Sequence, residues 1–259
     1  MTPDTGKYAD EKVRSLCLAA LSDRGLPQDY RDRCEHELRV ISEGNWSSAF
    51  LVCYDVCAYA DREGIWRGDG RGSAVGSLVC YLLNITRIDP MKYNLLFERF
   101  LNAHRVSPPD IDLDFETDRR HEVFAYLKIK YGSRNVALIS TISTLKIKGA
   151  IRDAARALDI PEVDLKGILN CFPHDTGLAD KITRWSDTID PKRAQQYAKR
   201  YPRLQPLVDL LMRRPRHSGK HAAGVIVSSK SLVGNIPLRH AKNEGMFMAQ
   251  WSLDDLERL

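Results

Sequence analysis

The sequence has no CxxC pair, no long apolar run and no apolar stretch at its start, although it is 259 residues long. Six cysteines are few for this length, which argues against a disulfide framework and against a zinc site. No run approaches the ~18 apolar residues of a membrane span, and MTPDTGKYADEK lacks the apolar core of a signal peptide. We therefore expect a globular, cytoplasmic protein with free thiols and no membrane partner.

The net charge of +5 conceals an uneven distribution of charge along the chain. Residues 121–220 hold 19 Lys and Arg against 10 Asp and Glu, a net of +9, and the remainder holds 20 against 24, a net of −4. A basic region of this size suggests a polyanionic partner. A hydrated basic surface explains the same count, so charge alone leaves both interpretations open.

Hydrophobic periodicity divides the chain into helical and extended segments. Helical spacing predicts helices from Tyr8 to about Leu26, from Tyr30 to Ile41, over 47–65, from Ala74 to Leu83 with Ser73 as N-cap, and from Asp118 to Tyr131. Apolar, β-rich or alternating runs predict strands over 110–115, 135–144 and 221–229. Between the last two strands, residues 142–217 are predicted to form a basic helical insert.

In SPPDIDLDFE, three aspartates alternate with apolar residues directly after two prolines. The alternation predicts a strand. Asp110, Asp112 and Asp114 would project from one face, because successive side chains of a strand point to opposite faces. Like charges roughly 6–7 Å apart repel one another and need a counter-charge, which a divalent cation can supply. Two Mg²⁺ ions ~3.5–4 Å apart on such carboxylates would clamp the oxygens of an in-line phosphoryl transfer.

The same residues allow other interpretations of this cluster to be tested. An EF-hand loop starting at Asp110 would need Gly and Glu where the chain has Phe115 and His121, so that interpretation fails. A phosphatase that uses the first aspartate as nucleophile remains open on the motif alone. So does a strand whose aspartates simply face water.

A glycine-rich stretch, RGDGRGSAVGSLVCYLL, lies about forty residues before the aspartates. Gly72 and Ser73 at a predicted helix start would offer N–H groups, a hydroxyl and the positive end of a helix dipole to an anion such as a triphosphate. The spacing matches neither a P-loop nor GxGxxG. A tight turn packed against a neighbour is the alternative.

Three long motifs occur in order: the stretch from GRGSAVGS to SPPDIDLDF, then STLKIKGAIRDAARAL, then SGKHAAGVIVSS. Together they resemble the bacterial C-family replicative DNA polymerases, the family of the DNA polymerase III alpha subunit. The resemblance implies an α+β fold with a palm like the polymerase-beta nucleotidyltransferases, a mixed sheet with helices, and an inserted helical thumb. It implies a first palm segment at 1–141, a thumb at 142–217 and a second palm segment at 218–259.

The resemblance also assigns roles to individual residues. Asp110 and Asp112 match the catalytic ligands of two Mg²⁺ ions, with Asp114 as a neighbour and not a principal ligand. The nucleotide-binding positions implied are Arg71, Gly72, Ser73, Arg99, Lys220 and His221. The side chains suited to phosphate contacts in the thumb are Lys146, Lys148, Arg152 and Arg156.

The sequence departs from the family at one catalytic position. The third catalytic aspartate of the family lies in a Lys-x-Asp-Phe-Leu-Gly-Leu strand, which this sequence does not reach before Leu259. We therefore expect little or no polymerisation by this chain alone; a fragment, a split gene product and a compact phage protein remain open.

The expected partners are primer–template DNA, dNTPs, the remaining polymerase segments (fingers and clamp-binding region) and the sliding clamp. The alternative is a non-catalytic nucleic-acid-binding or assembly module derived from such a polymerase.

Overall fold

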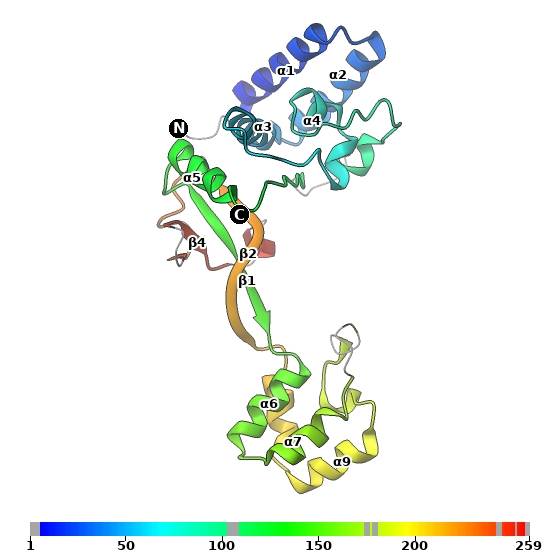
Figure 1. The fold of residues 1–259 in the computed structure, drawn as a ribbon, viewed down its shortest axis with the longest axis vertical. Helices are drawn as coiled ribbons and strands as arrows, with labels where there is room; N and C mark the ends of the chain where they lie inside the picture. Colours follow the sequence, from blue (N-terminus) through cyan, green and yellow to red (C-terminus); the bar gives the residue numbers. More distant parts are fainter. Residues whose placement is uncertain are drawn as a thin grey trace. The chain divides into compact units, whose positions relative to one another are not determined.

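Two compact units make up the chain in a computed structural model that describes residues 6–102, 109–173, 177, 181–241, 245–251 and 253–256. The first unit combines residues 1–139 with 222–259, and the second is residues 140–221. Strand β1 (Val136–Thr144) leads from the first unit into the second, and β2 (Pro215–Val227) leads back (Figure 1). The predicted insert at 142–217 lies within the second unit, whereas its identification as a thumb stays a prediction.

Helices and short 3-10 turns form most of the first unit. They are α1 (Gly6–Asp23), α2 (Gln28–Glu43), α3 (Ser47–Arg62), η1 (Gly72–Gly76), α4 (Leu78–Leu82), η2 (Phe97–Arg99), α5 (Arg120–Tyr131) and α11 (Leu253–Leu256). The helices predicted at the positions of α1, α2, α3 and α5 are confirmed. Within the parts of the chain that the structure describes, no helix is both long and apolar enough to cross a membrane.

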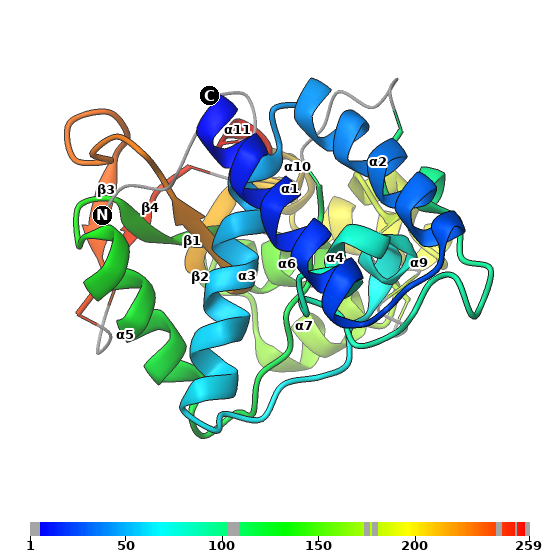
Figure 2. The same cartoon turned by 90° about the horizontal axis from the view of Figure 1, so that it is seen from above.

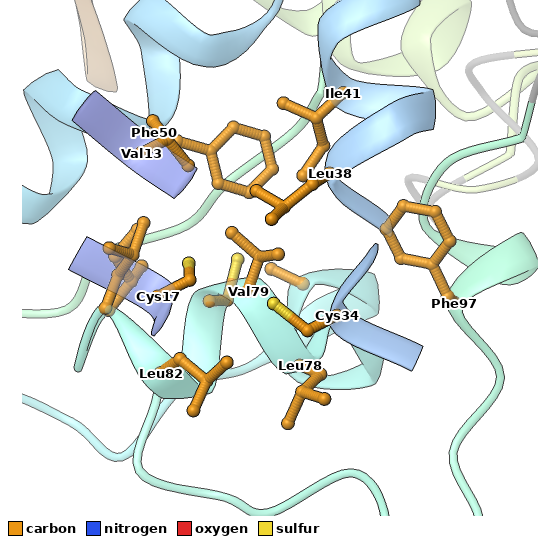
Figure 3. Packing of buried hydrophobic residues seen from close by; sticks show 14 of the residues in the cluster. Val13, Cys17, Cys34, Leu38, Ile41, Phe50, Leu78, Val79, Leu82 and Phe97 are labelled. Atoms are coloured by element: carbon orange, nitrogen blue, oxygen red, sulfur yellow. The ribbon is translucent and has the colours of Figure 1, made fainter. Parts of the chain in front are cut away.

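Helix α3 lies at the centre of this unit because its apolar residues serve two cores. Phe50 and Leu51 pack with α1, α2, α4 and η2, while Val56 and Ala60 pack with α5, β1 and β4. Figure 3 shows the first core, in which Phe50 lies among side chains from α1 and α2, and Figure 2 shows α3 between α1 and α5.

The six cysteines are free, as predicted, and burial raises the pKa of the Cys57 thiol to about 11.

A four-stranded mixed sheet completes the fold, in the order β2-β1-β4-β3. Strand β4 (Phe247–Ala249) is parallel to β1 and antiparallel to β3 (Leu238–His240). At one end of the β1–β2 pair, Leu145 N–H donates to Arg214 O at 2.9 Å; at the other, Ser228 N–H donates to Asn135 O at 2.9 Å. This order of partners makes β1 and β2 antiparallel. The α+β class is confirmed; a polymerase-beta-like palm stays a prediction.

The second unit has a core of its own, formed around an amphipathic helix. Its elements are α6 (Ile147–Ala157), α7 (Glu162–Leu169), η3 (Trp185–Asp187), α9 (Pro191–Arg200) and α10 (Leu204–Leu211). The apolar stripe of α6 is buried against this core, as the helical spacing predicts. Its charged residues are therefore left on the opposite face.

A buried carboxylate joins α2 to the segment that contains the glycine loop. Glu37 has no exposed surface, and it accepts hydrogen bonds from Ser77 Oγ at 2.8 Å and from the N–H groups of Leu78 and Val79 at 3.0 Å. Arg33 donates to Glu37 at 2.7 Å and to Gly76 O at 3.2 Å. Burial raises the pKa of Glu37, although these four hydrogen bonds oppose that shift. Glu37 and Arg33 thus attach η1 and α4 to α2.

We expect Glu37→Ala to lower the free energy of unfolding by about 3–5 kcal/mol, because it leaves buried donors and part of the Arg33 charge without a partner. Urea unfolding followed by far-UV circular dichroism measures this loss. Glu35→Ala is the matched control, since Glu35 lies on the same helix, is 40% exposed and pairs with Arg14. It should cost less than about 1 kcal/mol. Equal losses in the two variants would contradict the role of Glu37.

Candidate functional site

The aspartate segment is extended but does not form the predicted strand. Residues 109–114 have no regular secondary structure, and Phe115 makes a single antiparallel bridge with Arg67. Beside the bridge, Gly68 N–H donates to Asp114 O and Glu116 N–H donates to Trp66 O, both at 3.0 Å. The pairing is short because the glycine loop turns away after Gly68. Ser107 and Pro108, predicted to lead into the strand, lie outside the described residues.

The buried side chain of Arg67 holds this bridge in place. Only 3% of Arg67 is exposed, and its guanidinium donates to both carboxylate oxygens of Asp61 at 2.8 Å. It also donates to the carbonyl oxygens of Asn84 at 2.7 Å and Ile85 at 3.2 Å. The hydrogen bonds from Arg67 lower the pKa of the Asp61 carboxyl. A single residue thus ties three segments together: its side chain holds α3 and the segment after α4, and its backbone pairs with the aspartate segment at Phe115. The sequence pattern did not reveal this role.

Arg71 supplies a counter-charge to two of the three aspartates. Its Nη1 lies 3.0 Å from Asp112 Oδ2, and its Nε lies 3.0 Å from Asp114 Oδ2. Asp112 and Asp114 therefore lie on the same side of the segment, as the alternation predicts. Asp110 is exposed, and no ion pair joins its carboxylate to another of the described residues. Sequence reasoning placed Arg71 at the nucleotide and missed it as the partner of these carboxylates.

The structure brings the glycine loop and the aspartates together. Gly72 has a φ of +67°, in the left-handed region, and a Cβ there would lie 3.5 Å from Asp112 Oδ2. At Gly76 a Cβ would lie only 2.8 Å from Leu96 O, so this close approach also requires glycine. Ser73 is half-buried in the same 3-10 turn. The order of motifs in the sequence therefore corresponds to a real proximity.

The expected helix start at Ser73 is wrong. Residues 72–76 form the 3-10 turn η1, and α4 begins only at Leu78, where the Ser77 side chain accepts from Cys80 N–H. The first N–H groups of α4 already bind Glu37 and so are not offered to an anion. Anion contacts at this loop would have to come from Arg71 and the loop itself, not from a helix dipole.

The remaining predicted nucleotide contacts are placed less directly. Arg99 is exposed at the end of η2, which packs against η1 in the same unit. Lys220 and His221 lie on β2, where the second unit ends and the first resumes. Their assignment to the nucleotide stays a prediction.

The carboxylates of the aspartate segment suit Mg²⁺ better than a metal ion that needs an enclosing cluster of ligands. Over the described residues, no cluster of three or more His, Cys, Asp and Glu side chains could enclose a metal ion. Mg²⁺ does not need one, because it is usually held by one or two carboxylates, with water and phosphate completing the octahedron. Asp112 and Asp114 already converge on one cation, the guanidinium of Arg71. The predicted ligands, the exposed Asp110 and the half-buried Asp112, offer hard oxygen donors that fit Mg²⁺ in this open manner.

Basic side chains form one face of α6 in the second unit. Lys146 is the N-cap of this helix, and Lys148, Arg152 and Arg156 follow on it, with both arginines exposed. Arg216 from β2 joins this face: it pairs with Asp153, which also lies 3.6 Å from Arg156. Sequence analysis missed Arg216: the RRPR run at 213–216 could have indicated a basic segment, but its proximity to α6 required the fold.

Comparisons with known proteins agree over nearly the whole chain. The family model described as the bacterial DNA polymerase III alpha NTPase domain matches residues 7–259. The DNA polymerase III subunit alpha of Bacillus subtilis is 40% identical over 261 residues, which cover 100% of this chain and 23% of that protein. The error-prone DNA polymerase of Vibrio parahaemolyticus is 37% identical over 235 residues, covering 91% and 22% respectively. The chain thus spans about a quarter of the length of these curated relatives.

The Asp61–Arg67 pair should make stability depend on pH in a defined direction. Because the folded-state pKa of Asp61 is lowered, its contribution is present above the ordinary aspartate pKa and is lost as the pH falls through the folded-state value. Asp61→Asn should therefore destabilise the chain at pH 7 and differ progressively less from the wild type below about pH 4. Urea unfolding between pH 3 and pH 7 tests this.

The control is Asp69→Asn, whose carboxylate is 71% exposed and 3.7 Å from Arg87. It should change stability by less than about 1 kcal/mol across the same range. A cost of Asp61→Asn that stays constant from pH 7 to pH 3 would contradict the assignment.

Proposed function

This chain belongs to the bacterial DNA polymerase III alpha family, and on that premise we propose that it supplies the palm and thumb of a DNA-templated DNA polymerase. The proposed reaction is transfer of a nucleotidyl group from a dNTP to a primer 3′-hydroxyl with two Mg²⁺ ions. Because the chain spans about a quarter of its relatives, the activity is proposed for the polymerase that contains it. The remaining polymerase segments and a sliding clamp are its proposed partners.

One observation carries the proposal: Arg71 and Gly72 lie directly against Asp112. A basic side chain and a bare stretch of backbone border a carboxylate pair, with Arg71 3.0 Å from Asp112. A triphosphate needs donors for its oxygens, and its metal ions need carboxylates within the same few ångströms. A phosphate-binding loop without adjacent carboxylates, or carboxylates without a loop, would not support this reaction.

The residues divide the work of the proposed reaction. Asp110 and Asp112 would hold the metal ions, which when bound neutralise phosphate charge and lower the pKa of the attacking hydroxyl. Arg71 and Ser73 would bind the triphosphate oxygens, and Gly72 leaves the space beside Asp112 open. Additional phosphate contacts are proposed for Arg99, Lys220 and His221.

The basic face of α6 is proposed to bind the duplex. Lysine and arginine contacts to phosphate position DNA without reading its sequence, as a replicative enzyme requires. Lys146, Lys148, Arg152 and Arg156 would make these contacts, and Arg216 extends the face that they form.

A second candidate is the non-catalytic nucleic-acid-binding module. It is favoured by one observation, that the described residues bring no third carboxylate, histidine or cysteine to the Asp112 and Asp114 pair. The two candidates agree on DNA binding and differ only on chemistry, so primer extension separates them.

In the polymerase that contains this chain, Asp112→Asn should lower the rate of primer extension by a factor of about 10³ or more, because a catalytic metal ion loses a ligand. Extension of a labelled primer with Mg²⁺ and four dNTPs measures the loss, while primer–template affinity should change less than threefold. Asp118→Asn, an exposed aspartate beyond the bridge, is the control and should retain activity. Unchanged extension by Asp112→Asn would overturn the proposal.

The double variant Arg152→Ala with Arg156→Ala should bind duplex DNA more weakly, to a similar extent for unrelated sequences. If both arginines contact phosphates, the slope of log association constant against log salt concentration should become less steep, by about 2. Fluorescence anisotropy over a salt series measures both quantities. Lys166→Ala with Lys192→Ala removes the same charge from exposed positions on α7 and α9 and should leave the slope unchanged. Equal effects of the two double variants would reject a specific role for α6.

A further inference from the structure

Arg71 and a metal ion would compete for the negative charge of Asp112. The Arg71 guanidinium lies 3.0 Å from Asp112 Oδ2, and the same group reaches both oxygens of Asp114 at 3.2 and 3.0 Å. A divalent ion bound to the Asp112 carboxylate would lie within a few ångströms of the guanidinium and would repel it. The contact between Arg71 and Asp112 therefore opposes metal binding.

We propose that Arg71 is an internal competitor of the catalytic metal ion, one that holds Asp112 and Asp114 until a triphosphate draws it away. This inference rests on the proposed function, since it takes Asp112 as a metal ligand and Arg71 as a triphosphate contact. Arg71 then has two alternative partners, carboxylate and phosphate, and a guanidinium binds both in the same bidentate manner. Metal binding is disfavoured until the nucleotide is present.

The surroundings of Arg71 support this exchange of partners. Its side chain is 54% exposed, so it can turn toward a bound ligand without disturbing a core. Gly72 gives the adjacent backbone a left-handed conformation with no side chain between the loop and Asp112. By contrast, Arg67 is buried and held by four hydrogen bonds, so it stays in place while Arg71 moves.

The competition has a measurable consequence for the metal alone. In the absence of nucleotide, removing the guanidinium should strengthen metal binding. We expect a gain of about threefold to tenfold, which is about 0.6–1.4 kcal/mol and lies within the sum of two partly exposed ion pairs at ~0.2–1 kcal/mol each. Arg71→Lys should increase affinity less, because a lysine keeps the charge but cannot engage two carboxylates as a fork.

The experiment titrates the 259-residue chain with Mn²⁺ and measures free Mn²⁺ by electron paramagnetic resonance, without DNA or nucleotide. Arg71→Gln should bind Mn²⁺ about threefold to tenfold more tightly than the wild type. Arg62→Gln is the matched control: it removes an equal charge from a 63% exposed arginine that pairs with Glu63, and should change affinity less than twofold. Adding Asp112→Asn to Arg71→Gln should remove the gain.

The outcomes separate this inference from the proposed function. If Asp112→Asn weakens Mn²⁺ binding but Arg71→Gln and Arg71→Lys leave it unchanged, competition by Arg71 is wrong while the metal site stands. If Asp112→Asn has no effect in either background, the metal assignment fails and the inference fails with it. Equal gains in Arg71→Gln and Arg62→Gln would show a general charge effect and would also overturn competition by Arg71.

Discussion

The buried guanidinium of Arg67 is the interaction on which the arrangement of the site depends. It binds Asp61 at the end of α3 and two carbonyl oxygens after α4, and its own backbone pairs with Phe115. Beside this bridge, two backbone hydrogen bonds join the start of the glycine loop to the aspartate segment, and Arg71 adds its ion pairs with Asp112 and Asp114. A buried arginine is costly unless its donors are satisfied, and here four hydrogen bonds satisfy them. Because these hydrogen bonds hold Arg67 in place, they also hold Phe115, its bridge partner in the aspartate segment, next to the glycine loop.

Glu37 supports the other end of the glycine loop. It accepts the N–H groups that open α4, and Arg33 links it to Gly76 and to Leu95, just before η2. The loop is therefore held at both ends by buried, charged side chains, while Arg71 between them stays exposed. This contrast suits a site in which the backbone must stay in place and one side chain must change partners. It also explains why the helix start cannot serve the anion: its donors are used to hold the loop.

Much of the fold follows from local patterns. The helical spacing of Val13, Cys17 and Leu21 predicts α1 and its buried face, and the stripe of Ala150 and Ile151 predicts the buried face of α6. Period and burial coincide there because each helix packs one face on a core. The aspartate segment was predicted less well. Alternation correctly placed Asp112 and Asp114 on one side, but a regular strand needs a partner of matching length, and only Arg67 and its neighbours are available.

By itself the sequence determined the family and the residue types of the candidate site, since carboxylates, a glycine loop and basic helices are properties of residue type and order. Only the tertiary structure decided which charges meet. Arg71 lies more than forty residues before Asp114, and no periodicity relates them; their contact arises because Arg67 pairs its backbone with Phe115. The identity of Ser77 as the cap, and not Ser73, was likewise decided by Glu37, a carboxylate forty residues away. Local patterns report which face of an element is apolar, whereas the partners of buried charges are set by elements that are distant in sequence.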